Sequence, residues 1–198
     1  MQNIQAQIND LTSFMNTEVY VSLDEAVKAA LVRKKVELCG IYFLEIASKL
    51  NRNKQNGCYA PHKAVMIMAV MDLVKSGHIT SNVILLDKEL KGKFKEIWHR
   101  VVPIGSPYKC EYHNPFTHLD SAPFWNLSCE KNKAIITSET LFAFSHEESR
   151  TAIRHFLIHS IRKDTISEEY AESHHGINWM VAEEMIAFAP VLGMLIAI

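Results

Sequence analysis

The sequence predicts a mainly α-helical protein with a small β component. Three stretches support this prediction: an apolar helix between Pro61 and Gly77, a basic amphipathic helix after Asp87, and two short β-rich runs within residues 123–136. A buried helix, a connector and a basic helix in this order are typical of helix-turn-helix and winged-helix domains. The two β runs would form the hairpin of a wing. We therefore expect a helical domain with a winged-helix-like arrangement and a β-hairpin.

The N-terminal part of the chain is predicted to be helical. Apolar residues recur at helical spacing over residues 2–16, namely Ile4, Ile8, Leu11 and Met15. Ser22 followed by Glu25 is a capping-box signature, and a long helical pattern continues from there to about Leu50. Gly40 lies inside this pattern and indicates a kink or a close packing contact.

The stretch PHKAVMIMAVMDLVKSG predicts a helix that begins at Pro61 and stops at Gly77. Its central residues are apolar on every side, so the helix must be buried. Its N-terminus carries His62 and Lys63, although the helix dipole favours anions there. This placement predicts a phosphate site, and the alternative is a solvated lysine beside a packed histidine.

The charge of the chain is unevenly distributed. The formal net charge is -1, but residues 26–109 contain fifteen Lys and Arg against six Asp and Glu, a local charge of +9. This asymmetry indicates a face that binds a polyanion, and the alternative is a set of ordinary solvated helix faces.

The spacing of the cysteines and the sequence of the first ten residues indicate the cellular compartment and the kinds of site that the chain could hold. The four cysteines are widely spaced without a CxxC pair, which argues against a zinc ribbon, a redox motif or a disulfide scaffold. The start MQNIQAQIND resembles no secretory signal. We expect a cytoplasmic protein with no catalytic centre, no metal site and no cofactor.

The segment VPIGSPYKCEYHNPFT, residues 102–117, is predicted to be irregular and to line a pocket. Its prolines restrict the backbone, and its aromatic residues alternate with cations in a way that suits nucleic acid. The alternative is a loop that its own aromatic side chains fold onto the core.

The C-terminal third contains one further predicted helix and an apolar end. Ser145 and Glu148 form a second capping box, and the helix that follows carries His155 and His159 four residues apart, without the glutamate that a zincin motif requires. The last fourteen residues are uncharged and too short for a typical membrane span. We expect them to dock into the core or onto a partner, with membrane contact as the alternative.

Four stretches in order resemble the sulfur-binding domain that reads phosphorothioate-modified DNA in HNH-type, type IV restriction endonucleases. They are HKAVMIMAVMDLVKSGHITSNVI, FKEIWHRV, NPFTHLDSAPFWNL and FAFSHEESRTAIRHFLIHSI. The resemblance implies a mostly helical domain that docks on duplex DNA and accepts the sulfur in a shallow apolar pocket. It divides the chain into an N-terminal helical extension (1–35), a DNA-recognition domain (36–165), and an acidic linker with an apolar C-terminal helix (166–198).

The resemblance also implies which residues make the site. The sulfur or phosphate pocket would be formed by Asn114, Pro115, Phe116 and His118. His62 and Lys63 would contact the DNA backbone, and Arg52 and Lys54 would add phosphate contacts. Independently of the resemblance, the aromatic and basic segment adds Lys109 and His113 as expected DNA contacts. The sequence departs from the family pattern at Ala64, where proline is usual, at Asn114, where an aromatic residue is common, and at His118, where a small residue is usual.

These observations lead to a first hypothesis and two alternatives. The first is a DNA-binding recognition module of a restriction or defence system. It would have no nuclease centre of its own, because no HNH pattern is present, and would act with a separately encoded nuclease. One alternative is a protein-interaction subunit or regulator that keeps the fold and docks through its apolar C-terminal tail, and the other is the specificity part of an HNH endonuclease. A homo-oligomer formed through the C-terminal tail is also expected as a possible assembly.

Overall fold

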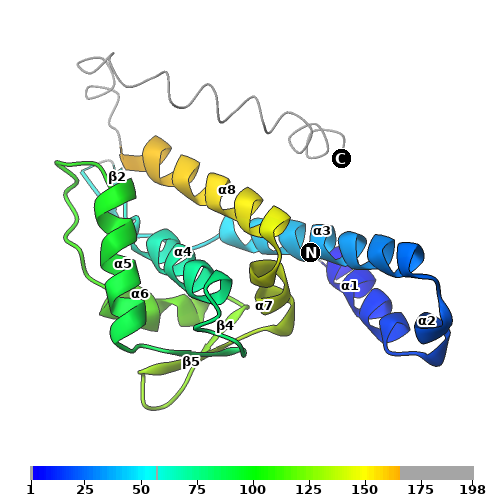
Figure 1. Cartoon of the computed structure of the whole chain (residues 1–198). Helices are drawn as coiled ribbons and strands as arrows, with labels where there is room; N and C mark the ends of the chain where they lie inside the picture. The colour runs from blue at the N-terminus through cyan, green and yellow to red at the C-terminus, as the bar shows by residue number, and fades with distance from the viewer. Residues whose placement is uncertain (1, 57, 166–198) are drawn as a thin grey trace. The chain divides into compact units, whose positions relative to one another are not determined.

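Two helices, α3 (Glu25–Ala47) and α4 (His62–Lys75), form the centre of the fold (Figure 1). The structure is a computed structural model that describes residues 2–56 and 58–165. The other helices are α1 (Gln2–Met15), α2 (Glu18–Ser22), α5 (Lys88–Val101), α6 (His113–His118), α7 (Ser138–Ser145) and α8 (Glu147–Thr165), with a short 3-10 turn, η1 (Leu119–Ser121). The prediction of a mainly helical protein is confirmed.

The helix α4 is buried, as its sequence predicts. Each residue from Val65 to Met71 is at most 1% exposed, because α5, α6, α7 and α8 pack around the helix. Gly77 ends it with φ +75°, a conformation that favours glycine, and the N–H of His78 donates to the carbonyl of Leu73 at 3.0 Å. Pro61, which was predicted to be the first helical residue, is instead the N-cap, and the helix begins one residue later at His62.

The β component consists of two small antiparallel sheets. The first pairs β1 (Lys54–Gln55) with β2 (Cys58–Tyr59), and the second has the strand order β3-β5-β4, with β3 (Val83–Leu85), β4 (Trp125–Leu127) and β5 (Lys133–Ile136). The hairpin β4–β5 is the predicted one, and β3 joins it from between α4 and α5 in the chain. The predicted small β component with a hairpin is thus confirmed, and β3 extends the hairpin to a three-stranded sheet.

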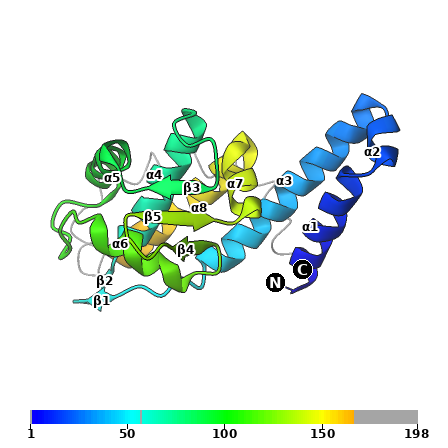
Figure 2. The ribbon, with the colours of Figure 1, turned by 90° about the horizontal axis from the view of Figure 1, so that it is seen from below.

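The N-terminal helices form an arm. The helix α1 packs against α3 and buries Ile8, and Figure 2 shows α1, α2 and the first half of α3 projecting from the rest of this part of the chain. The predicted start of the long helix is two residues early: Asp24, whose carboxylate accepts the N–H of Val27 at 3.0 Å, is its N-cap. At Gly40 the structure shows close packing, since a Cβ there would lie 3.0 Å from Ser149 Oγ.

Three local expectations differ from the structure. The segment that was expected to be irregular contains α6, because the carboxylate of Glu111 accepts the first N–H groups of this helix. The helix α7 was not expected. Ser145, which was predicted to cap the following helix, is the last residue of α7, and α8 begins at Glu147. The predicted C-terminal helix of residues 166–198 lies outside the described residues. Among the described helices, none is long and apolar enough to cross a membrane.

Candidate functional site

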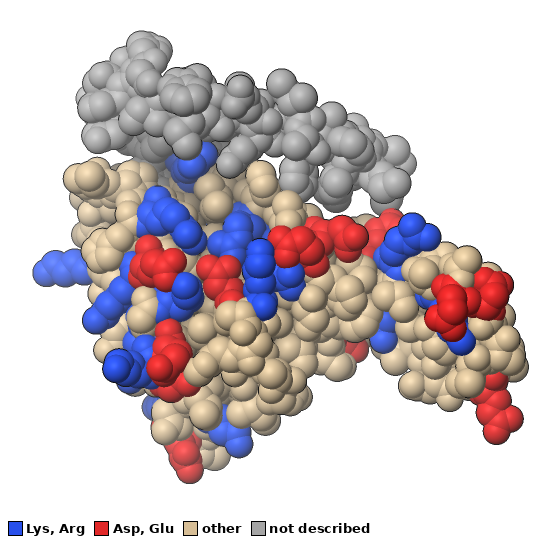
Figure 3. Space-filling model, in the orientation of Figure 1, with Lys and Arg blue, Asp and Glu red and all other residues tan. Residues whose placement is uncertain are grey.

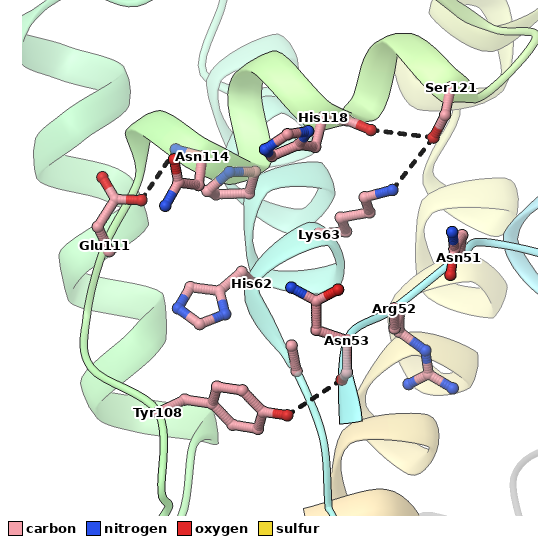
Figure 4. Close-up of a pocket in the computed structure, with 12 residues that line it drawn as sticks. Asn51, Arg52, Asn53, His62, Lys63, Tyr108, Glu111, Asn114, His118 and Ser121 are labelled. Atoms are coloured by element: carbon pink, nitrogen blue, oxygen red, sulfur yellow. Dashed lines mark hydrogen bonds between the residues drawn. The ribbon is translucent and has the colours of Figure 1, made fainter. Parts of the chain in front are cut away.

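A pocket of about 430 Å³ opens at the N-terminus of α4 (Figure 4). Its walls come from the chain before β1, the first turn of α4, the segment between α5 and α6, and α6 with η1. The lining residues are Asn51, Arg52, Asn53, Ala60, His62, Lys63, Tyr108, Glu111, Asn114, Pro115, His118 and Ser121. Segments far apart in the sequence therefore converge where the buried helix begins.

His62 is fixed in the pocket wall by aromatic contacts and by one hydrogen bond. Its ring centroid lies 4.6 Å from that of Trp98 and 5.6 Å from that of Tyr108, and its Nε2–H donates to the carbonyl of Lys109 at 2.8 Å. Burial lowers the pKa of His62 below its usual value, and the bond to Lys109 offsets part of this effect. The imidazole is therefore mainly neutral at pH 7 without an anion.

Lys63 is a half-buried ammonium group without a carboxylate partner. Its Nζ donates to Ser121 Oγ at 3.2 Å, and among residues 2–56 and 58–165 no acidic side chain pairs with it. Burial lowers the pKa of Lys63. Pro61 provides no side-chain cap, so the positive end of the helix dipole adds to this charge. The arrangement favours the binding of an anion.

The edge of the pocket near the β1–β2 hairpin adds two cations around an aromatic ring. The guanidinium of Arg52 lies 5.1 Å from the ring centroid of Tyr59, and Lys54 Nζ lies 5.2 Å from the same centroid. Arg52 Nη1 also donates to Ser160 Oγ at 3.3 Å, which orients the guanidinium. Tyr59 is 37% exposed, so this edge presents cations and an aromatic surface to solvent.

The helix α6 forms the opposite wall. Glu111 accepts the N–H groups of His113 at 2.6 Å and Asn114 at 2.8 Å and so caps α6, and its charge also acts on His62 by raising the pKa of the imidazole against the larger effect of burial. Pro115 is a buried apolar residue of the lining, and His118, which is exposed, also lines the pocket. The pocket thus combines the ammonium group of Lys63 on α4 with the apolar side chain of Pro115 on α6.

The structure brings six of the predicted site residues together and separates four from them. Arg52, His62, Lys63, Asn114, Pro115 and His118 line the pocket. Lys54, Lys109 and His113 are exposed outside its lining. Phe116, which we expected in the wall, is instead fully buried in the core, with its ring 5.2 Å from that of Trp125, because it lies on the inner side of α6.

Several lining residues were not predicted. Asn51, Asn53, Ala60 and Ser121 carry no motif, and only the three-dimensional convergence of the segments reveals them. Tyr108 belongs to the aromatic segment that was expected to line a pocket. Its hydroxyl donates to the carbonyls of Asn53 at 3.0 Å and Cys58 at 2.9 Å, which joins this segment to the β1–β2 hairpin.

The described part of the chain holds one group of side chains with the spacing of metal ligands. The ligand atoms of His78, Asp87 and Glu89 lie within 4.8 Å of one another. Asp87 already caps α5 by accepting the N–H of Leu90 at 2.9 Å, and its other oxygen lies 3.3 Å from His78 Nε2. The contact of Asp87 with His78 is therefore explained as a helix cap that also makes a hydrogen bond. The group shares no residue with the pocket.

No protein-family model matches the chain, and no curated protein matches it. The chemistry of the pocket is therefore the main guide to what the chain binds.

Proposed function

We propose that this chain is a recognition module that binds duplex DNA through its backbone at the pocket of α4. The observation that carries the proposal is Lys63: a half-buried ammonium at an uncapped helix N-terminus, with a neutral serine as its contact. Such a group is stabilised when a phosphate enters, because the anion supplies the missing countercharge. His62 gains a proton more readily beside the same anion.

The pocket has a polar and an apolar side, and this combination supports recognition of a phosphorothioate group. Sulfur in place of a non-bridging oxygen is larger and less strongly hydrated, so an apolar wall costs it less desolvation. Pro115 offers such an apolar wall in the pocket that Lys63 also lines. The four stretches that resemble sulfur-binding domains also support phosphorothioate recognition. In restriction and defence systems, such domains identify the modified DNA.

Polar and basic side chains outside the lining would extend the contact along the duplex. Lys54 flanks the exposed ring of Tyr59 together with the lining residue Arg52. Lys109 directly follows Tyr108 of the lining, and His113 directly precedes Asn114. Contacts of this kind bind the backbone without reading sequence. Recognition would then be coupled to cleavage by a separately encoded nuclease, and the chain would itself act as the specificity part of an HNH-type system in the cytoplasm.

The proposal is tested by fluorescence polarisation of a labelled duplex over a salt series. Replacing Lys63→Gln should weaken binding about tenfold and lower the slope of log K against log salt by about 1, since one phosphate contact is lost. Lys88→Gln is the matched control: it removes one exposed charge from the N-terminus of α5, outside the pocket. Equal affinity of the Lys63 variant and the wild type would contradict the proposal.

A protein-interaction function is the second candidate, because apolar side chains are exposed on the arm. Val19 and Val21 on α2 are 59% and 70% exposed, and Val27 and Phe14 lie on the neighbouring helices with partial exposure. Val19→Ser with Val21→Ser should abolish complex formation with a partner if this surface docks one. An unchanged elution volume and unchanged co-purification would remove this candidate. The predicted role of the C-terminal tail in oligomers lies outside the described residues.

A further inference from the structure

A second cavity of about 370 Å³ lies between α4, α5 and α8 and shares no residue with the first pocket. It is lined mainly by charged side chains from these three helices. In Figure 3 the Lys and Arg side chains gather over α5 and beside α8, with Asp and Glu side chains among them. The cavity lies within the size range of small-molecule sites, about 300–1,000 Å³.

Two carboxylates in the cavity are each shared by two cations. Asp72 of α4 pairs with Arg154, and one of its oxygens lies 3.9 Å from Arg100 Nη2.

The second carboxylate, Glu147 of α8, pairs with Arg150, and its Oε1 lies 3.4 Å from Lys75 Nζ. Arg100 also lies 3.9 Å from Glu96, which is outside the lining, so these four cations meet three carboxylates and keep an excess of one positive charge. A network whose only role is to join helices needs no such excess.

Arg150 is held rigidly in this cavity. It is only 9% exposed, its Nη1 donates to the carbonyl of Phe144 at 2.7 Å, and its Nη2 donates to Glu147. Its Nε is buried and has no hydrogen-bond partner among the described residues. The buried guanidinium is thus incompletely satisfied, which is costly unless another negative group approaches.

We propose that this cavity binds a phosphate dianion, either free or as the terminal group of a nucleotide. The excess positive charge favours an anion, and Arg100 and Lys75, each more than half exposed, are placed to contact it at the opening. The positive end of α8 and the negative end of α4 both face the cavity. Their dipoles largely offset each other, so the side chains decide the affinity.

The test follows the Nε–H resonances of Arg100, Arg150 and Arg154 by NMR while inorganic phosphate is added to the full chain at constant ionic strength. We expect a saturable shift that persists in Lys63→Gln, which disables the first pocket. In the double variant Lys75→Gln and Arg100→Gln, half-saturation should need at least about tenfold more phosphate. Both substituted side chains are largely exposed, so the fold is retained.

Controls separate this site from general charge effects and identify the source of the phosphate. Lys88→Gln should titrate like the wild type. Saturation by adenosine 5′-monophosphate at a lower concentration than by inorganic phosphate would assign the site to a nucleotide, and the reverse order would assign it to free phosphate. A shift equal to that caused by chloride, a shift lost in Lys63→Gln, or an unchanged titration of the double variant would overturn the proposal.

Discussion

Lys63 Nζ donates to Ser121 Oγ across 3.2 Å, and Ser121 Oγ in turn donates to the carbonyl of His118 at 3.0 Å. This chain of hydrogen bonds ties the first turn of α4 to the turn that follows α6. It holds the ammonium group at the pocket without neutralising it, because both partners are uncharged. The pocket is thereby organised for an anion before any anion is bound.

Replacing Lys63→Met should stabilise the protein while weakening DNA binding. Burial lowers the pKa of Lys63, which means that the folded state disfavours its charged form. We expect the free energy of unfolding in urea to rise by about 0.5–1 kcal/mol, as is common when a binding residue is replaced. Lys88→Met, at an exposed position, should change it little. A loss of stability in the Lys63 variant would show that the ammonium is a structural group.

His62 should make stability depend on pH. Its pKa is lower in the folded than in the unfolded protein, where it is near 6.5, so the unfolded chain binds more protons between the two values. The stability that the protein gains from keeping His62 neutral is fully present above pH 6.5. It is lost as the pH falls through the lower pKa that His62 has in the folded state. His62→Gln should therefore lose less stability than the wild type between pH 7.5 and 5 in urea unfolding.

The matched control for this pH effect is His113→Gln, because His113 is exposed and lies outside the pocket lining. This variant should keep the pH dependence of the wild type. If stability depended on pH in the same way in the wild type and in His62→Gln, burial would not be disfavouring the protonated form of His62.

Gly40 and Ser149 form a contact between α3 and α8 that a double-mutant cycle can measure. A Cβ at position 40 would lie 3.0 Å from Ser149 Oγ, so Gly40→Ala should lower the free energy of unfolding by about 1–3 kcal/mol. Ser149 Oγ is buried without a hydrogen-bond partner among the described residues, so Ser149→Ala alone should be neutral or stabilising.

In the double variant the next atom, Ser149 Cβ, lies at an ordinary 3.6 Å. Alanine is also preferred over glycine in a helix by about 1 kcal/mol. The double variant should therefore be at least as stable as the wild type. If the double variant instead lost as much free energy of unfolding as Gly40→Ala does, the contact with Ser149 Oγ would not be the cause of that loss.

His118→Ala should improve the discrimination between sulfur and oxygen. The exposed imidazole of His118 occupies the pocket beside Pro115, and its removal leaves a wider and more apolar wall. We expect the ratio of affinities for a modified and an unmodified duplex to rise about threefold, measured by polarisation. His113→Ala should leave the ratio unchanged, and a fall of the ratio in His118→Ala would assign sulfur contact to the imidazole itself.

Elements with strong local signals could be predicted from the sequence. The helix α4 has a proline before it, a glycine after it and an apolar surface all round, and its predicted burial is confirmed. The helix α1 and the β4–β5 hairpin were also predicted, from the spacing of apolar residues and from a turn between two β-rich runs. Local chemistry fixes such elements largely independently of the rest of the chain.

The features that were predicted wrongly depend on tertiary contacts that the local sequence does not reveal. The helix α6 is only six residues long and depends on Glu111 as its cap, so its sequence carries little helical signal. Phe116 lies in the same short segment as Pro115 and was expected to share its role. Because a helix turns by about 100° per residue, the two side chains point in different directions, and Phe116 enters the core.

The measurement that bears most directly on the proposed function is the polarisation of a short labelled duplex with one phosphorothioate, compared with the identical unmodified duplex across a salt series. We expect both affinities to fall with salt, and the modified duplex to bind more tightly by a ratio that salt leaves nearly constant, because the sulfur contact adds no charge. Equal affinity for the two duplexes would contradict phosphorothioate reading, and no binding of either would contradict DNA recognition.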